Sequence, residues 1–503
     1  MTRPSVHEQI ATLVDDGSWT SWDTTPIDVD TDADYAADLA RARAATGLDE
    51  AVVTGTATLR GRPIALVACD FRFLGGSIGI AAGERLTEGI RRATTERLPL
   101  LAMPTSGGTR MQEGAVAFLQ MVRITAAIVD HKAAHLPYLV YLRHPTTGGV
   151  FASWGSLGHI TLAEPGALVG FLGPRVFEAL YGTPFPSDVQ TAENLHAHGI
   201  IDAVVPVQRL GGMVDRALTV MTQPPAKTAP STSEPAHPVT MSAWQSVCAS
   251  RREDRPGVRE LLGRAATDVV ELNGTGQGEI DTGLVLALAR FGDTPCVLLG
   301  QDRHGQTADT PLGPGALRQA RRGMRLAAEL RLPLVTVIDT AGAALSQAAE
   351  EGGIAGEIAR CIADLVALPV PTISVLLGQG TGGGALALVP ADRILAAQNG
   401  WLSPLPPEGA SAILHLDTAH AETMADKQGI RALDLYENGA VDRIIAELPD
   451  AADEPEAFIR RVGATLQYEL ADLSTVDERS RMTARVRRFD LIGQSRRILA
   501  QAG

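Results

Sequence analysis

The chain has 503 residues, of which 45% are hydrophobic and 20% are charged, enough apolar side chains for more than one buried core. Its formal charge of −14 excludes a broad basic surface for nucleic acid or an anionic membrane. The longest uncharged run, 365–391, contains three prolines and a glycine cluster. We therefore predict a buried strand and turn there, and no membrane span.

The cysteines indicate a reducing compartment. The four of them lie far apart without a CxxC pair, which excludes a zinc ribbon and predicts no bound metal. Cys69 and Cys296 lie in apolar, strand-like runs, so we expect buried free thiols. The N-terminus has no apolar signal segment, and we expect a cytoplasmic protein.

In the first half of the chain, a short apolar strand leads into a glycine-rich turn and then a helix. We expect a buried strand at 98–103, a turn at 106–108 and a helix at 111–129. A second glycine-rich turn follows at 147–149.

A proline-rich linker at 223–238 divides the chain into two halves of similar size, 1–222 and 239–503. The linker has five prolines and no hydrophobic periodicity. The end of the second half, 455–503, has a helical period and predicts a peripheral helical tail. Its basic stretch 481–490 is expected to be a solvated helix face.

The second half repeats the pattern of the first. We expect strands at 334–338 and 373–377, a helix at 349–365, and glycine-rich turns at 340–343 and 380–384. Strands that alternate with helices indicate an α/β fold with mostly parallel pairing.

The two halves also align in sequence without a gap at an offset of 234 residues. The segment 97–109 matches 331–343, and 136–150 matches 370–384. Chance matching would not keep one register over so long a stretch, so we predict two copies of one fold.

The four glycine-rich turns are the candidate chemical sites. Glycine allows the backbone to approach a ligand closely, and free N–H groups at such a turn can bind an anion. Two facing turns can form an oxyanion hole, in which each donor contributes about 3 kcal/mol. The alternative interpretation is that the glycines only permit tight turns and close helix packing.

Other catalytic motifs are weak. The GxGxxG match at 378–383 lacks an acidic residue at the spacing of a dinucleotide site. There is no GxSxG sequence, and neither Ser106 nor Ser153 has evident His and Asp partners. We interpret His144, which precedes a turn, as structural.

Long motifs in both halves resemble the carboxyltransferase component of bacterial acetyl-CoA carboxylase. The first half resembles its β subunit in FRFLGGSIG, TSGGTRMQEG, LPYLVYLRHPTTGGVFASW and HGIIDAVV. The second half resembles its α subunit in RLPLVTVIDTAGA, GQGTGGGALAL and NGAVDRII. The resemblance implies two tandem crotonase-like domains, with acyl-CoA on the side of 1–222 and carboxybiotin on the side of 239–503. The family's four-cysteine zinc ribbon is absent from this sequence.

The resemblance also implies a reaction and its residues. The carboxyl group of carboxybiotin would move to the α-carbon of acetyl-CoA to give malonyl-CoA, with biotin itself as the base. Gly107 and Gly108 would donate N–H groups to the thioester enolate, and Gly342 and Ala343 would polarise the biotin ureido oxygen. The implied substrate-binding residues are Gly75, Gly76, Arg110, Gly148, Gly149, Gly382 and Gly383.

The implied partners are separate chains. No lysine lies in an M-K-M context, so the biotin would be supplied in trans by a biotin carboxyl carrier protein and charged by a biotin carboxylase. The resemblance implies at least a homodimer, within an ATP-dependent complex of fatty acid biosynthesis. Two alternatives stay open: a biotin-independent malonyl-thioester decarboxylase, and a non-catalytic acyl-CoA-binding assembly subunit.

Overall fold

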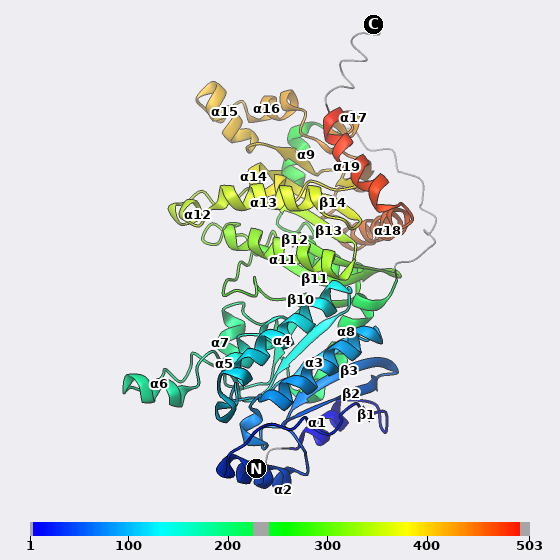
Figure 1. Ribbon diagram of the computed structural model, residues 1–503. Helices are drawn as coiled ribbons and strands as arrows, with labels where there is room; N and C mark the ends of the chain where they lie inside the picture. The colour runs from blue at the N-terminus through cyan, green and yellow to red at the C-terminus, as the bar shows by residue number, and fades with distance from the viewer. Residues whose placement is uncertain (1–3, 225–240, 493–503) are drawn as a thin grey trace. The chain divides into compact units, whose positions relative to one another are not determined.

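The computed structural model describes residues 4–224 and 241–492 (Figure 1). The chain divides into two compact units. The first unit ends at Thr222 and also takes in Gly276–Glu279, and the second unit holds the remaining described residues. Residues 225–238 of the predicted linker lie outside the described residues.

The first unit is built on a seven-stranded sheet. Its strand order is β1-β2-β3-β4-β5-β7-β9, antiparallel up to β3 and parallel from there on. A two-residue turn in which Arg60 and Gly61 both have positive φ joins β2 to β3, as a type I′ hairpin requires. The strands are β1 (Thr20–Ser21), β2 (Val52–Leu59), β3 (Arg62–Cys69), β4 (Leu100–Met103), β5 (Tyr138–Leu142), β7 (Ile160–Ala163) and β9 (Ala203–Val204), with β6 (Thr146–Thr147) paired to β8 (Val169–Gly170).

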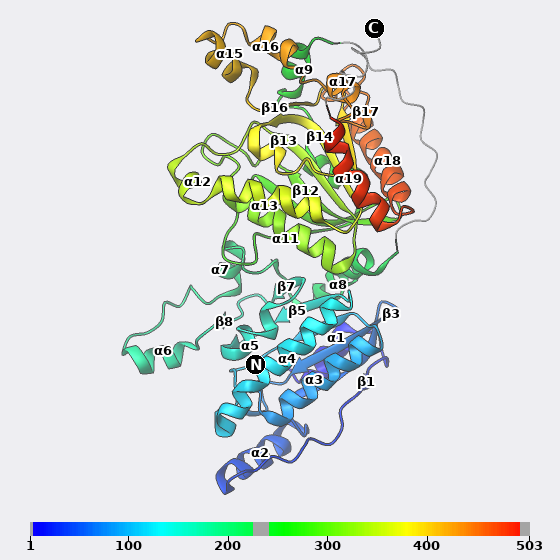
Figure 2. The same cartoon turned by 45° about the horizontal axis from the view of Figure 1, so that its top comes forward.

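Helices α3 and α4 pack side by side in this unit (Figure 2). Their apolar residues, among them Leu86, Ile90, Ile124 and Ile128, are buried in the same core as residues of the sheet. The predicted strand at 98–103 and most of the predicted helix at 111–129 are confirmed. The helices are α1 (Val6–Leu13), α2 (Ala33–Thr46), α3 (Ile80–Thr95), α4 (Gly114–Ala133), α5 (Gly148–Phe151), α6 (Pro174–Tyr181), α7 (Ala192–Ala197) and α8 (Val207–Thr222).

The second unit repeats this architecture. Its strand order, β10-β11-β12-β13-β14-β15-β17, has the same sequence of antiparallel and parallel pairs, with β16 beside β14. The prediction of two copies of one fold is therefore confirmed. The strands are β10 (Thr267–Leu272), β11 (Leu284–Phe291), β12 (Thr294–Gln301), β13 (Leu334–Thr340), β14 (Thr372–Thr381), β15 (Arg393–Ala397), β16 (Trp401–Ser403) and β17 (Arg443–Ile445).

The helices of the second unit depart from the sequence prediction at one glycine pair. The helix predicted at 349–365 is broken at Gly352-Gly353, where Gly353 has φ +78°. The strand predicted at 373–377 continues to Thr381, so the GxGxxG match lies mainly within a strand. The helices are α9 (Ala243–Ser250), α10 (Val258–Ala265), α11 (Pro314–Leu330), α12 (Gln347–Glu351), α13 (Ile354–Ala367), α14 (Gly382–Leu386), α15 (Pro407–His415), α16 (Ala421–Gln428), α17 (Ala432–Glu437), α18 (Pro455–Leu473) and α19 (Glu478–Leu491).

Of the predicted C-terminal tail, α18 belongs to the core of this unit, whereas α19 contributes no residue to that core, and residues 493–503 lie outside the described residues. Phe458 and Leu466 of α18 are fully buried with strands of the sheet. The expected solvated face at 481–490 is wrong for two arginines, because Arg481 and Arg485 are buried and hold the Asp392 carboxylate at 3.2 and 2.8 Å. The charge pattern of the sequence did not predict the burial of these arginines, because their partner, Asp392, lies far away in the chain.

The cysteine prediction is confirmed: Cys69 and Cys296 are buried and free, and burial raises the pKa of each thiol to about 12. Within residues 4–224 and 241–492, no helix is long and apolar enough to cross a membrane. Over the same residues, no cluster of three or more His, Cys, Asp or Glu side chains could hold a metal ion.

Candidate functional site

The turn between β4 and α4 depends on a glycine and a hydroxyl group. Gly108 has φ +111°, a conformation that residues with a Cβ rarely adopt. Its N–H donates to the Ser106 Oγ at 3.0 Å, and that hydroxyl donates to the Gly108 carbonyl oxygen at 3.3 Å. Ser106 is fully buried, so its hydroxyl group fixes the conformation of Gly108 from the protein interior.

The second glycine turn of this unit packs directly on the first. A Cβ added at Gly108 would lie 3.4 Å from the Gly148 Cα and 3.6 Å from the Gly149 nitrogen. Only glycine permits so close an approach of two backbones. We call residues 105–109 together with 147–149 the first cradle.

The N–H groups of Gly107 and Gly108, expected from the motif to reach the enolate, are engaged within the protein. Gly107 donates to the Gly75 carbonyl oxygen at 2.9 Å, and Gly108 donates to the serine hydroxyl. The Gly148 N–H also donates to a loop carbonyl oxygen at 2.9 Å. These glycines therefore shape the first cradle, and its open donors must lie elsewhere.

The open backbone donors of the first cradle belong to Thr109 and Gly149. The Ile78 N–H donates to the Gly108 carbonyl oxygen, and the Arg110 N–H donates to the Ile78 carbonyl oxygen, each at 2.9 Å. Neither bond uses the Thr109 N–H, which lies between them in the chain. Within the described part of the chain, neither the Thr109 N–H nor the Gly149 N–H has a hydrogen-bond partner. Thr109 was not among the residues predicted from the sequence, although its repeat partner, Ala343, was.

Gly75 and Gly76 contact the backbone of the first cradle. Gly75 accepts the Gly107 N–H, as described above, and both glycines have positive φ. A Cβ added at Gly76 would lie 2.0 Å from the Thr105 carbonyl oxygen. The two residues thus fix the position of the turn.

The Arg110 side chain is engaged within the protein beside the first glycine turn. Its guanidinium is 1% exposed and donates to the Glu50 carboxylate at 2.9 Å, to the Ser77 carbonyl oxygen at 2.8 Å and to the Tyr35 hydroxyl at 3.2 Å. Burial and the hydrogen bond with Glu113 raise the pKa of Tyr35 to about 12. Arg110 thus neutralises buried carboxylates beside the turn, and the expected contact of its side chain with substrate stays a prediction.

The second unit contains the same arrangement. Gly342 has φ +131°, and its N–H donates to the Thr340 Oγ1 at 3.1 Å. Ala343 follows it and bridges to Leu312 as Thr109 bridges to Ile78. A Cβ added at Gly384 would lie 3.1 Å from the Ala343 nitrogen, so the start of α14 packs on this turn.

We call residues 339–343 together with 381–384 the second cradle. The N–H groups of Ala343 and Gly383 have no hydrogen-bond partner among the residues that the structure describes, like those at the equivalent positions of the first cradle. Gly382, with φ +63°, begins α14 and starts this part of the turn.

Buried polar side chains hold the second cradle in place. The Gln301 amide donates to the Gly384 carbonyl oxygen at 2.7 Å and accepts the Asp339 N–H at 3.2 Å. The Thr340 hydroxyl donates to the Gln306 Oε1 at 2.5 Å. Burial raises the pKa of the Asp339 carboxyl above its ordinary value, although the guanidinium of Arg303 lies 3.3 Å away.

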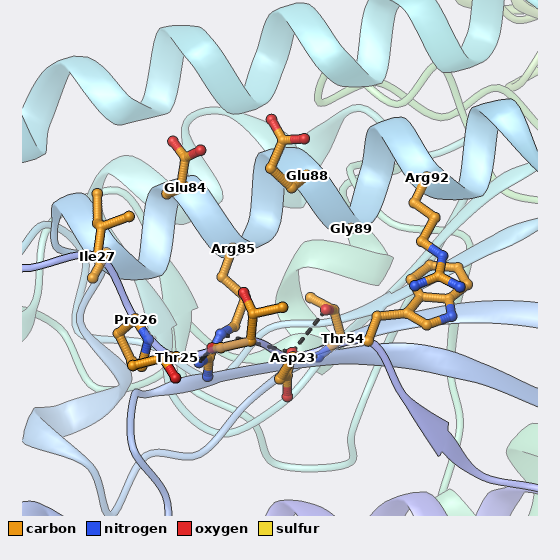
Figure 3. A pocket seen from close by; sticks show the side chains of 13 residues that line it. Asp23, Thr25, Pro26, Ile27, Thr54, Glu84, Arg85, Glu88, Gly89 and Arg92 are labelled. Carbon is orange, nitrogen blue, oxygen red and sulfur yellow. Dashed lines mark hydrogen bonds and ion pairs between the residues drawn. The ribbon is translucent and has the colours of Figure 1, made fainter.

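Two other features lie away from the cradles. His144 is exposed, and its Nδ1 accepts the Leu168 N–H at 3.0 Å, as its structural interpretation requires. A cavity of about 370 Å³ lies between residues 22–27 and α3 (Figure 3). Arg85 crosses it and donates to the Asp49 carboxylate at 2.8 Å. None of the predicted site residues lines this cavity.

Comparison with known proteins gives a match over almost the whole chain. The carboxyl transferase domain matches residues 3–482. The "Probable biotin-dependent acyl-coenzyme A carboxylase beta3 subunit" of Mycobacterium tuberculosis is 60% identical over 496 residues, which are 99% of this chain and 100% of that protein. The "Acetyl-coenzyme A carboxylase carboxyl transferase subunits beta/alpha" of Salinispora arenicola is 36% identical over 518 residues, covering 98% and 92%.

Solved structures agree on the fold. Transcarboxylase 12S, with methylmalonyl-coenzyme A and methylmalonic acid bound, superposes with a TM-score of 0.71 at 22% identity, covering 92% of this chain and 89% of that one. Both halves have the crotonase-like α/β fold that the resemblance implied.

Proposed function

Because the chain belongs to the carboxyl transferase domain family, we propose that it is the carboxyltransferase subunit of a biotin-dependent acyl-CoA carboxylase. One observation carries the proposal: among the described residues, the N–H groups at two equivalent positions of each cradle have no hydrogen-bond partner. The proposed reaction places negative charge on two oxygens, that of the thioester and that of the biotin ureido group. Two sets of fixed backbone donors suit this chemistry.

The first cradle is the proposed acyl-CoA site. The N–H groups of Thr109 and Gly149 would bind the thioester oxygen and stabilise the enolate that forms when the α-proton leaves. Removal of one donor of such a site lowers the rate about 10²- to 10³-fold. Gly107 and Gly108 act in this proposal by holding the turn in shape.

The second cradle is the proposed carboxybiotin site. Ala343 and Gly383 would donate their N–H groups to the ureido oxygen, with Gly342 and Gly382 shaping the turn around them. Carboxybiotin, held on a separate carrier protein, supplies the carboxyl group and the nitrogen that accepts the α-proton. The C–N bond would break first and release CO2, the freed nitrogen would take the α-proton, and the α-carbon of the enolate would then form the C–C bond with that CO2.

We propose acetyl-CoA as the acyl substrate and malonyl-CoA as the product. Relatives at 36% identity are named as acetyl-CoA carboxylase subunits, and the relative at 60% identity is named as an acyl-CoA carboxylase subunit. The proposed partners are a biotin carboxyl carrier protein, a biotin carboxylase and a second copy of the chain.

The test is malonyl-CoA decarboxylation by the purified chain with and without free biotin. We expect a rate that depends on biotin, since this is the reverse reaction with biotin as the acceptor. Gly108→Ala should abolish it, because φ +111° does not accommodate a Cβ. Gly211→Ala in α8 is the matched control, since its Cβ would meet only ordinary contacts at 3.6 Å or more.

Two results would overturn the proposal. A rate that is the same without biotin would identify a biotin-independent decarboxylase. A chain that binds the CoA ester but shows no rate, even with the biotinylated carrier protein present, would be a non-catalytic subunit.

A further inference from the structure

The two cradles share their backbone but differ at one side chain. Gly108 and Gly342 both have a positive φ and an N–H held by a hydroxyl two residues earlier. The residue that follows, whose N–H is open, is Thr109 in the first unit and Ala343 in the second. The first cradle therefore carries a hydroxyl group that the second lacks.

The Thr109 side chain lies close to Gly149, the residue that carries the other open N–H. A Cβ added at Gly149 would be 3.3 Å from the Thr109 Oγ1 and 3.2 Å from the Met121 Cγ. The hydroxyl thus sits over the start of α5, next to an apolar side chain. Thr109 is only half-buried, so a ligand can reach it.

Neighbouring hydroxyl groups in the first cradle are occupied, and that of Thr109 is not. The Thr105 hydroxyl donates to the His144 carbonyl oxygen at 3.0 Å, and the Thr147 hydroxyl lies 3.4 Å from the Ser106 carbonyl oxygen. Within the described ranges, no protein group forms a hydrogen bond with the Thr109 hydroxyl.

We propose that the Thr109 hydroxyl is a further catalytic group, which donates a hydrogen bond to the thioester oxygen beside the backbone N–H groups of Thr109 and Gly149. This inference rests on the proposed function of the first cradle. In the proposed reaction the thioester oxygen takes on negative charge, which an additional fixed donor on the acyl-CoA side would stabilise.

The experiment compares Thr109→Val, Thr109→Ala and Thr109→Ser in biotin-dependent malonyl-CoA decarboxylation, with kcat and KM measured for both substrates. We expect Val and Ala to lower kcat about 10- to 100-fold with little change in the KM for malonyl-CoA, because the donor acts mainly on the developing charge. Ser should recover most of the loss. Thr95→Val, an exposed position in α3, is the control for loss of a hydroxyl elsewhere.

The outcomes separate the inference from the proposed function. An active wild type with a Thr109→Val variant of equal kcat would refute the inference alone. A loss that appears only in KM, or a Ser variant as poor as Ala, would refute it too, since the hydroxyl would then serve ground-state binding or shape. A wild type without biotin-dependent activity would refute the proposed function, and the inference with it. Thr109→Ala shows the effect of the missing hydroxyl even if valine disturbs the packing.

Discussion

Two adjacent glycines behind the first cradle allow a sharp test of how the turn is held. Gly75 and Gly76 have φ +67° and +62°, so alanine at either position costs about 1–2 kcal/mol in backbone conformation. The space around them differs. A Cβ at Gly75 would meet only the Phe71 ring at 3.9 Å, whereas a Cβ at Gly76 would lie 2.0 Å from the Thr105 carbonyl oxygen.

The difference can be converted into expected effects. A real Cβ rarely comes within about 3 Å of such an atom, so Gly76→Ala must displace the Thr105 carbonyl oxygen by about 1 Å. Such overpacking adds about 1–3 kcal/mol to the conformational cost. A displacement of about 1 Å in a catalytic constellation lowers the rate about 100-fold. We therefore expect Gly76→Ala to lose about 2–5 kcal/mol of stability and about 100-fold in kcat/KM, and Gly75→Ala to lose far less of both.

Urea unfolding measures the loss of stability. Biotin-dependent malonyl-CoA decarboxylation, assayed under conditions where each variant is folded, measures the loss of kcat/KM. Equal losses of activity in the two variants, with both folded, would refute the reasoning, because Gly75 would then contact substrate directly. A fully active Gly76→Ala variant would refute it as well, since the turn would not depend on this packing.

Three other predictions concern the rest of the molecule. Thr340→Val removes the hydroxyl that holds the glycine N–H of the second cradle, so the biotin-dependent rate should fall about tenfold and Thr340→Ser should recover it, as steady-state kinetics will show. Arg485→Met removes a buried partner of the Asp392 carboxylate and should lower the free energy of unfolding by about 3 kcal/mol in urea, while the exposed Arg487→Met should not. Burial lowers the pKa of His131 from 6.5 to about 4, so as the pH falls the unfolded chain binds a proton at this side chain before the folded chain does. The free energy of unfolding should therefore fall by up to about 3 kcal/mol from pH 6.5 to pH 4. His131→Gln should flatten the dependence of the urea midpoint on pH.

The sequence predicted the fold well because the two halves repeat the same pattern, so that each element expected in one half is supported by its equivalent in the other. Apolar strands and glycine turns occur in the same register in both halves, and few strand orders are compatible with that pattern. The helix predicted at 349–365 failed at Gly352-Gly353 because hydrophobic periodicity continues across the break. The buried arginines of α19 escaped prediction because their partner, Asp392, lies about 90 residues earlier in the chain.

The sequence predicted a candidate site at the glycine turns, and the structure changes which N–H groups of the first turn are open. The motif pointed to Gly107 and Gly108, but their N–H groups are engaged with the Gly75 carbonyl oxygen and a serine hydroxyl. Which N–H stays open depends on the bonds that Ile78 makes on either side of Thr109. Such long-range partners cannot be read from the local sequence.

A site made of backbone donors has consequences for how its specificity can arise. The N–H groups of the two cradles are chemically identical, and the same positive-φ glycine and hydroxyl shape each of them. Two different oxygens therefore have to be distinguished by the side chains that surround the donors. Thr109 and Ala343 are the first such difference along the chain at an open donor. If Ala343→Thr left the biotin-dependent rate unchanged while Thr109→Val lowered it, the asymmetry would belong to the acyl-CoA side.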